Sequence, residues 1–294
     1  MMATSRRTRK WTDGLLVLPA MLWLLVFVIT PIGFLFCISL WTSTAFGITP
    51  IWVLDNYVLI VSEPVYLRVL WQTLRIALVT TALSLLISYP IAMFLTRLKG
   101  NTKSIFVLVL FLPFWTSYVV RSFVWLPMLG RNGLLNNWLM SLGVVDQPVD
   151  WFLYNEGTVY VGLVYVYTLF MTLPIYLSLD RLDPKLIEVA SDLGATPFRT
   201  FRRVVLPLTM PGVMSGCTMV FLLSCGAFVT PQLLGGPSGV MFGNVIASQF
   251  LNANNWALGA ALSIVLVTVV MVCVVVAARC LGLQQIFIGE RMGQ

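Results

Sequence analysis

The sequence predicts an all-α integral membrane protein with six transmembrane helices. Hydrophobic residues make up 59% of the chain and charged residues 10%, whereas a soluble globular domain carries roughly 25% charged residues. Several charge-free stretches are close to the ~20 residues that a spanning helix needs. Lipid cannot satisfy bare backbone groups, so only helices or a closed barrel can span a bilayer. Apolar runs of this length favour helices.

The first predicted span covers about 14–40 and follows a basic cytoplasmic segment, 1–13, that contains Arg6, Arg7, Arg9 and Lys10. A cleaved signal peptide also combines a basic start with an apolar run. Here the apolar segment continues to Trp41, which is far beyond the roughly 7–15 residues of a signal-peptide core. The sequence therefore predicts an uncleaved first helix.

Charged residues and turn residues divide the rest of the chain. Asp55, Glu63, Arg68 and Arg75 indicate a loop after the first span. No charged residue lies between Val204 and Ala278, a run too long for one helix, and glycines and asparagines between 235 and 255 predict a loop that splits it. The remaining predicted spans are about 76–96, 104–120, 157–179, 209–231 and 257–279, and 280–294 forms a tail.

Basic residues predict the orientation. With the N-terminus inside, 14 Lys and Arg residues fall in the inner segments and four in the outer ones, as the positive-inside rule requires. Both termini and the loop 180–205 are therefore predicted to be cytoplasmic. The long outer segment 121–156 contains apolar residues that suggest a helix lying on the outer surface.

The loop 180–205 predicts two short helices joined at a glycine. The first should begin after Asp183-Pro184, because proline suits the first helical turn, and should end at Gly194, where a left-handed conformation is common. Apolar and charged residues fall on opposite faces by their spacing. The apolar face holds Leu186, Val189, Ala190 and Leu193, and the charged face holds Lys185, Glu188 and Asp192.

The second helix should begin at the pair Thr196-Pro197, a capping hydroxyl followed by proline. Phe198, Phe201 and Val205 form an apolar stripe on it, and Arg199, Arg202 and Arg203 form a basic one. Spacing alone leaves two interpretations open: the loop packs on its own membrane domain, or it docks on another protein.

This segment resembles the Glu-Ala-Ala coupling motif of ABC-importer permeases. Val189 stands where the motif has alanine and Val204 where it has isoleucine, and both substitutions keep an apolar side chain. The matching positions are Glu188, Val189, Ala190, Gly194, Val204, Leu206 and Pro207. Over about 12–285 the chain is similar to spermidine/putrescine permeases of the PotB/PotH type, at 54–57, at 111–116 with Arg121, at 162–165, at 206–212 and at 243–246 with 249–251.

The resemblance implies a type I ABC-importer permease fold in the bacterial inner membrane. It implies a second, homologous permease, two cytoplasmic ATPase subunits and a periplasmic or lipid-anchored binding protein as partners, with no role for nucleic acid. No glycine in the chain is followed by lysine, so the phosphate-binding loop of an ATPase is missing. ATP and Mg²⁺ are therefore expected on a partner, and this chain is expected to be non-catalytic. The implied coupling residues are Glu188, Ala190, Asp192, Gly194, Arg199, Arg202, Leu206 and Pro207.

The resemblance also implies a polyamine substrate, although permeases for opines, aminoethylphosphonate and ferric iron share much of the pattern. A cation crossing an apolar passage needs carboxylates or aromatic faces, and no acidic residue lies inside a predicted span. Asp146, Asp150 and Glu156 on the outer side either attract a cation, dock the binding protein or are simply solvated. The aromatic pathway candidates are Trp115, Tyr118, Tyr165 and Tyr167, with Tyr89 beside them; packing and interface roles are the alternative.

Two other classes of protein fit the sequence less well. A stand-alone secondary transporter would be expected to keep ionisable residues at membrane depth. A membrane enzyme would need catalytic or metal-binding groups, but histidine is absent and the five cysteines have no metal-ligand spacing. Pro90, Pro113 and Pro174 are either ordinary kinks or gate hinges, and Gly212 with Gly216 allows close helix approach, within this chain or to a partner.

Overall fold

A computed structural model describes residues 18–44 and 47–280. Five helices in this part are long and apolar enough to cross a membrane, and a bent pair of helices adds a sixth candidate. The fold is therefore the predicted multi-span helical class. The predicted basic segment 1–13, the start of the first span at 14–17 and most of the tail 280–294 lie outside the described residues.

The described residues divide into two compact units, one made of those in 18–64 and 246–269 and the other of those in 65–245 and 270–280. In the first unit, a helix over Leu18–Ser39 contains a π-helical turn, η1 (Leu25–Ile29), followed by α2 (Thr30–Ser39). The turn ends just before Pro31, which has no N–H to donate to a regular helical bond. A two-stranded antiparallel hairpin follows, β1 (Thr42–Thr44) and β2 (Gly47–Thr49).

Side chains of α3 (Asp55–Ser62) hold the first unit together. The Tyr57 hydroxyl lies 2.7 Å from the Ser39 hydroxyl, and the Asn56 amide donates to the carbonyls of Ser39 and Trp41 at 3.0 and 2.9 Å. Ser43 Oγ accepts a hydrogen bond of 3.0 Å from the backbone of Ala257. The stretch 54–57 thus ties α3 to the end of α2.

The predicted loop around 55–75 is wrong. Residues 55–62 form α3, and α4 (Pro64–Arg97) is a single helix of 34 residues, about 51 Å long at 1.5 Å per residue. This exceeds the ~30 Å hydrocarbon core. Because helical hydrogen bonds form in water as well as in lipid, hydropathy located the apolar part of α4 but not its beginning.

The predicted span 104–120 is also wrong as a continuous helix. In its place are α5 (Gly100–Phe111) and a 3-10 turn, η2 (Leu112–Trp115), after which the chain bends by 92°. Pro113 lacks an N–H, and Thr116 and Ser117 have extended backbone angles. The expected surface helix in 121–156 is in fact a series of short helices: α6 (Tyr118–Phe123), α7 (Trp125–Leu129), α8 (Leu134–Ser141) and the 3-10 turn η3 (Asp150–Phe152).

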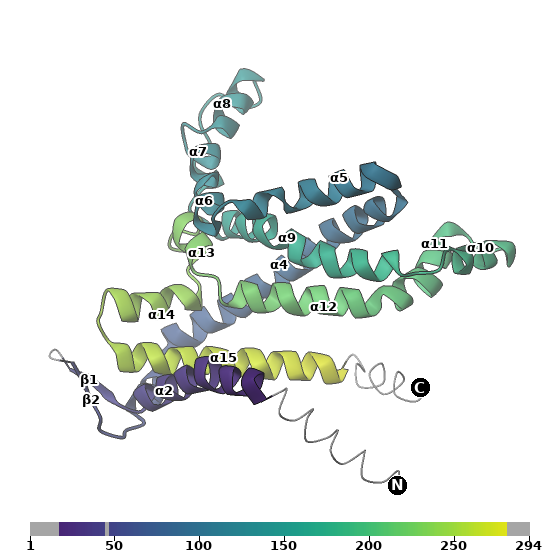
Figure 1. The fold of residues 1–294 in the computed structure, drawn as a ribbon. Helices are drawn as coiled ribbons and strands as arrows, with labels where there is room; N and C mark the ends of the chain where they lie inside the picture. Colours follow the sequence, from purple (N-terminus) through teal and green to yellow (C-terminus); the bar gives the residue numbers. More distant parts are fainter. Residues whose placement is uncertain (1–17, 45–46, 281–294) are drawn as a thin grey trace, which may run out of the picture. The chain divides into compact units, whose positions relative to one another are not determined.

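The core of the second unit is the pair α9 (Glu156–Asp180) and α12 (Leu206–Cys225), which run side by side (Figure 1). A Cβ atom on Gly212 would lie 2.5 Å from the carbonyl oxygen of Pro174, and one on Gly216 would lie 2.8 Å from Met171 Sδ. The glycine pair therefore brings two helices of this chain together. Val159, Leu163 and Met171 are fully buried around this contact.

The predicted span 209–231 ends too late. α12 stops at Cys225, Gly226 and Ala227 interrupt the helix, and α13 (Val229–Leu234) follows. The predicted loop after it contains a further helix, α14 (Phe242–Leu251). The last helix, α15 (Trp256–Cys280), extends one residue beyond each end of the expected span 257–279, as α9 does for 157–179.

Candidate functional site

The segment after α9 has the predicted helix–glycine–helix form. It consists of α10 (Pro184–Asp192) and α11 (Pro197–Thr200), which lie between the last residue of α9 and the first residues of α12 (Figure 1). The Asp183 carboxylate accepts a hydrogen bond from the backbone of Lys185 at 3.0 Å, and the Thr196 hydroxyl accepts one from Arg199 at 3.4 Å. The predicted cap at Thr196 and the predicted helix start at Pro184 are therefore confirmed, and the Asp183 carboxylate adds a cap that was not predicted.

Gly194 ends α10 in the predicted left-handed conformation, with φ of +77°. Its N–H donates to the Ser191 carbonyl at 2.9 Å, and the next N–H, of Ala195, donates to the Ala190 carbonyl at 3.0 Å. This pair of bonds is the Schellman arrangement that satisfies the last carbonyls of a helix. A side chain at position 194 would be strained by the backbone angle alone, since no atom lies within 4 Å of its Cβ position.

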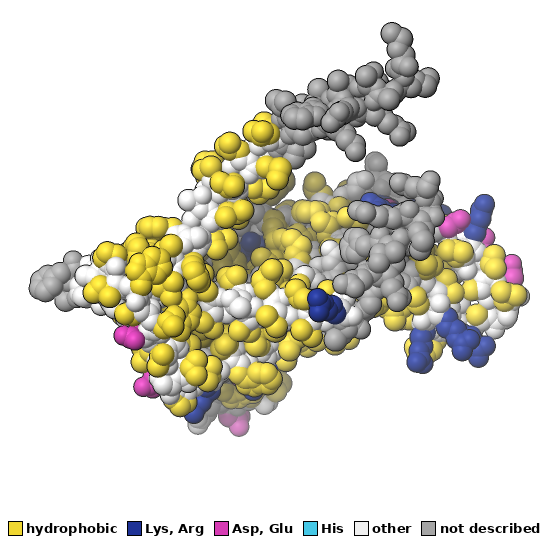
Figure 2. All heavy atoms as spheres, turned by 90° about the horizontal axis from the view of Figure 1, so that it is seen from below, with side chains coloured by type: hydrophobic (Ala, Val, Ile, Leu, Met, Phe, Trp, Pro, Cys, Tyr) yellow, Lys and Arg dark blue, Asp and Glu magenta, His cyan; other side chains and the backbone are white. Residues whose placement is uncertain are grey.

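The apolar face of this segment is open to solvent. α10 buries none of its side chains, and its main contacts within the chain are with α11 and η4. Leu193 is 83% exposed and Phe198 72% exposed. Figure 2 shows charged side chains of both signs gathered at the end that carries this segment, with hydrophobic side chains among them. The exposed apolar residues are Leu186, Ile187, Val189, Leu193 and Phe198, and the exposed implied coupling residues are Glu188, Asp192, Arg199 and Arg202; Ala190 is half-buried.

The second short helix is not separate from the membrane span. A continuous helix covers Pro197–Cys225, with a π-helical turn, η4 (Phe201–Val205), immediately before Leu206-Pro207. The Leu206 N–H donates to the Phe201 carbonyl, and the turn lies where Pro207 has no N–H to donate. Leu206 is half-buried in the core, and Pro207 is exposed.

The predicted stripe of Phe198, Phe201 and Val205 is divided. Val205 is buried and Phe201 packs edge-on against Tyr89 of α4, with 5.4 Å between ring centroids, whereas Phe198 points into solvent. The Tyr89 hydroxyl lies 2.8 Å from Thr209 Oγ1. These contacts join the beginning of α12 to α4 next to Pro90.

Of the four aromatic pathway candidates, Tyr118 and Tyr167 lie close to each other. Tyr118 Oη lies 2.8 Å from Thr230 Oγ1, and Tyr167 Oη donates to the Leu223 carbonyl at 3.1 Å. These two hydroxyls hold the α12–α13 turn. Trp115 is 81% exposed, and Tyr165 alone of the four lines the cavity described next.

A cavity of about 780 Å³ lies among α4, α5, α6 and α9. Its walls are aliphatic and aromatic, with Leu83 and Ile87 from α4, Phe106 and Val109 from α5, and Val161 and Tyr165 from α9 among them. One charged side chain, Arg121, also lines it. Sequence reasoning assigned Arg121 to an outer loop, although it is the only charged residue between Lys103 and Arg131, a signal that could have singled it out.

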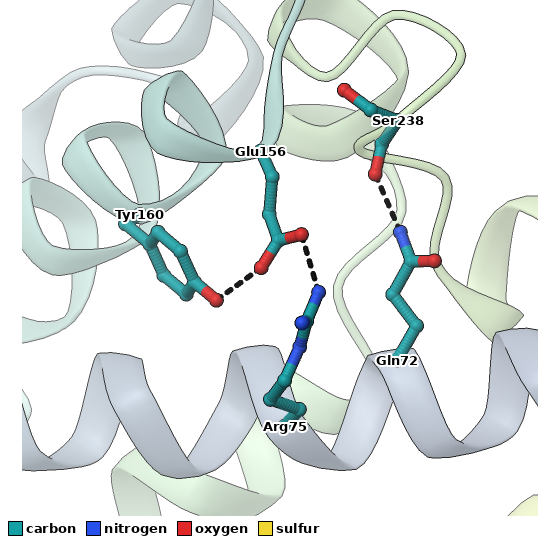
Figure 3. Close-up of polar contacts among 5 residues, drawn as sticks. All are labelled: Gln72, Arg75, Glu156, Tyr160 and Ser238. Atoms are coloured by element: carbon teal, nitrogen blue, oxygen red, sulfur yellow. Dashed lines mark hydrogen bonds and ion pairs between the residues drawn. The ribbon is translucent and has the colours of Figure 1, made fainter.

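A polar cluster lies where α4 meets the first turn of α9 (Figure 3). Arg75 Nη2 is 2.5 Å from Glu156 Oε2, and the Tyr160 hydroxyl donates to the other carboxylate oxygen. On the same helix as Arg75, the Gln72 amide donates to the Ser238 carbonyl at 2.6 Å.

Two of the three carboxylates predicted to lie on the outer side are therefore paired, since Asp150 also lies 3.3 Å from Arg131. Asp146 is exposed. Within 18–44 and 47–280, no cluster of His, Cys, Asp or Glu could hold a metal ion.

The sequence matches the family described as binding-protein-dependent transport system inner membrane component, over residues 1–282. The chain belongs to this family. It is a multi-pass inner-membrane permease component of an ABC importer.

Named members of the family and solved structures agree with this assignment. The chain is 39% identical over 250 residues to the spermidine/putrescine transport system permease protein PotB of Escherichia coli K12, covering 85% of this chain and 90% of that protein. It is 33% identical over 214 residues to the inner membrane ABC transporter permease protein YdcU of the same organism, covering 69% and 68%.

The fold of this permease is shared with a chain in the crystal structure of a bacterial alginate ABC transporter in complex with an alginate pentasaccharide-bound periplasmic protein. The TM-score is 0.68 at 19% identity, covering 95% of this chain and 96% of that one. A second match, to a chain of the inward-facing MetNI methionine ABC transporter, has a TM-score of 0.52 at 16% identity, covering 73% and 93%.

Proposed function

We propose that this permease couples to a cytoplasmic ATPase through α10, Gly194 and α11. The observation that carries the proposal is the exposed apolar face of a capped, well-formed pair of helices. Leu193 and Phe198 are among the most exposed large apolar residues of the chain, and such patches rimmed by charges are typical of protein interfaces. Glu188, Asp192, Arg199 and Arg202 would supply the rim. ATP and Mg²⁺ would be bound by the ATPase.

Force would pass from the ATPase into the membrane along α12. Because α11, η4 and α12 are continuous, a displacement at Phe198 moves the start of the span. Gly212 and Gly216 place α12 directly against α9, and Phe201 and Thr209 link it to Tyr89 of α4. The π-helical turn before Pro207 would be the joint, since such turns interrupt the regular helical ladder.

This role requires α10, Gly194 and α11, here called the coupling segment, to be cytoplasmic, together with both termini. The distribution of Lys and Arg supports that orientation. An ion pair of 2.5 Å between Lys103 and Asp180 joins the cytoplasmic ends of α5 and α9 in this arrangement. A homologous second permease would complete the passage, and a periplasmic or lipid-anchored binding protein would deliver the substrate.

The proposed substrate is a polyamine, on the strength of the 39% identity to PotB and the resembling stretches. The described part of the chain offers a cation little direct recognition, because Glu156 and Asp150 are already paired. Selection would then rest mainly on the binding protein and the second permease.

The substrate is tested by uptake. The complete operon, expressed in a strain without its own polyamine importers, should accumulate radiolabelled putrescine or spermidine, and deletion of this permease alone should abolish the uptake. Accumulation of an opine, aminoethylphosphonate or ferric iron in place of the polyamines would contradict the proposed substrate and leave the coupling proposal untouched.

The coupling role is tested with matched glycine variants. Gly194→Val should abolish uptake and leave the membrane level of the chain unchanged. Gly143→Val is the control, because Gly143 also has a positive φ, +68°, and no atom within 4 Å of its Cβ position. Glu188→Lys should likewise abolish uptake, whereas Glu63→Lys, at another exposed carboxylate, should not. Normal uptake with Gly194→Val and Glu188→Lys would overturn the coupling role.

A further inference from the structure

Arg121 is a charge held in apolar surroundings. Its side chain is 9% exposed, and its Nε is buried without a hydrogen-bond acceptor among residues 18–44 and 47–280. The guanidinium lies over the Phe114 ring, 4.5 Å from the centroid. A cation–π contact compensates only part of the cost of removing a charge from water. A buried charge of this kind is normally paired.

The cavity beside Arg121 contains no counter-charge of its own. No carboxylate lines it, and its other polar side-chain groups are the indole N–H of Trp125 and the hydroxyls of Tyr160, Tyr165 and Thr168. Two of these are already engaged: Tyr160 donates to Glu156, and Thr168 donates to the Val164 carbonyl. Arg121 is therefore the group that an anion entering the cavity would meet.

The shape of the cavity adds a second requirement. The α4 wall extends from Leu83 to Leu95, about 18 Å at the helical rise, and faces Phe106 and Val109 of α5. An occupant that fits must combine one anionic group with a long apolar stem. A small hydrated anion would leave the apolar walls uncovered, and a polyamine would be repelled by the guanidinium.

We propose that this cavity binds an anionic phospholipid of the surrounding bilayer, with the phosphate group at Arg121 and an acyl chain along α4 and α5. The phosphate would accept charged hydrogen bonds from the guanidinium, which are among the stronger ones. Basic pockets between membrane helices bind anionic headgroups in this way. The bilayer supplies such a ligand at high local concentration.

Lipid binding is tested on the full-length chain purified together with its partner subunits. The complex is delipidated and titrated with phosphatidylglycerol or phosphatidylcholine of the same acyl chains, and bound lipid is counted by native mass spectrometry. The wild-type complex should retain one more molecule of phosphatidylglycerol than of phosphatidylcholine per complex. Arg121→Gln should weaken that binding about tenfold or more, the loss expected for a charged hydrogen bond. Arg131→Gln is the control, because Arg131 is an exposed arginine paired with Asp150.

The alternatives give different results. Equal retention of the two lipids by the wild-type complex overturns the proposal. This measurement does not depend on whether any variant folds. Competition by glycerol phosphate at the same concentration as the lipid would mean that a free anion is the ligand. Loss of the second permease from Arg121→Gln, with no change in phosphatidylglycerol binding, would mean that a partner carboxylate pairs with Arg121. If Arg121→Gln does not assemble, Arg121→Lys should keep the preference for phosphatidylglycerol, and its loss in that variant also contradicts the proposal.

Discussion

The proposed coupling segment and the Arg121 cavity combine apolar and charged side chains in opposite ways. In the coupling segment, exposed apolar side chains such as Leu193 and Phe198 stand among charges outside the apolar spans. In the cavity, a single charge stands among apolar side chains between helices. Each region lacks the complement that would make it stable by itself. In a membrane subunit, apolar surface exposed outside the spans therefore indicates a protein partner, and an unpaired charge in apolar surroundings indicates an anion.

The largest effect is expected at the contact between α9 and α12, which supports both regions. Gly212→Ala places a Cβ atom 2.5 Å from the Pro174 carbonyl oxygen and 2.3 Å from Ser178 Oγ, and a backbone carbonyl in a packed helix cannot move aside cheaply. We expect a destabilisation of about 2 kcal/mol or more. Quantitative immunoblotting of membranes should show the loss. Gly33→Ala is the control, since its Cβ position has no neighbour within 4 Å; equal levels of both variants would refute the close α9–α12 contact.

The next largest effect should come from charging the exposed apolar face. The double variant Leu193→Asp with Phe198→Asp removes two exposed side chains that, when buried, each contribute roughly 1.5–3 kcal/mol. We expect co-purification of the ATPase to fall about 100-fold, with a normal membrane level. Leu142→Asp is the control at an exposed leucine of the segment predicted to be extracytoplasmic. Undiminished ATPase binding by the double variant would contradict the view that the exposed apolar face binds a protein partner.

A smaller effect is expected at the joint between α12 and α4. Tyr89→Phe removes the hydroxyl that lies 2.8 Å from Thr209 Oγ1, an interaction of about 1 kcal/mol. The expected result is a severalfold lower ratio of substrate transported to ATP hydrolysed in proteoliposomes, with ATP hydrolysis itself retained. Tyr66→Phe serves as the matched change on the same helix. An unchanged ratio would show that α4 takes no part in transmission.

The smallest effect should come from the ion pair in Figure 3. Arg75 is half-exposed beside Glu156, and solvated ion pairs contribute roughly 0–1 kcal/mol. Glu156→Gln should therefore change the membrane level and uptake by less than about twofold, and the effect should shrink further at high salt. A loss as large as that of the coupling variants would show that this cluster is a working part of the transporter and not a solvated contact.

The coupling segment was predicted almost residue by residue because its determinants are local. Caps at Asp183 and Thr196, the glycine at 194 and the three- and four-residue spacing act within one or two helical turns. What the spacing left open was the partner of the apolar face. α10 contacts α11 and η4 but leaves its apolar face largely exposed, which favours docking on another protein.

Hydropathy predicted the ends of some spans accurately and the ends of others poorly. α9 and α15 agree with hydropathy to within one residue at each end, whereas α4 begins earlier, the third span breaks after Trp115, and α12 stops at Cys225. Hydropathy sums transfer free energies over a window. Helix ends depend on individual backbone hydrogen bonds: Pro113 has no N–H to donate, and the regular hydrogen bonds of α12 end at Gly226.

The sequence by itself determined that the protein folds in a membrane, the class of its fold and the helix–glycine–helix form of residues 184–200, because composition, charge distribution and capping act locally. Only the tertiary structure decided which side chains meet across the chain. Tyr89 and Thr209 are 120 residues apart, and Arg121 reaches a cavity with walls from helices before and after it. Contacts of that range depend on how the helices pack, and no local pattern in the sequence specifies them.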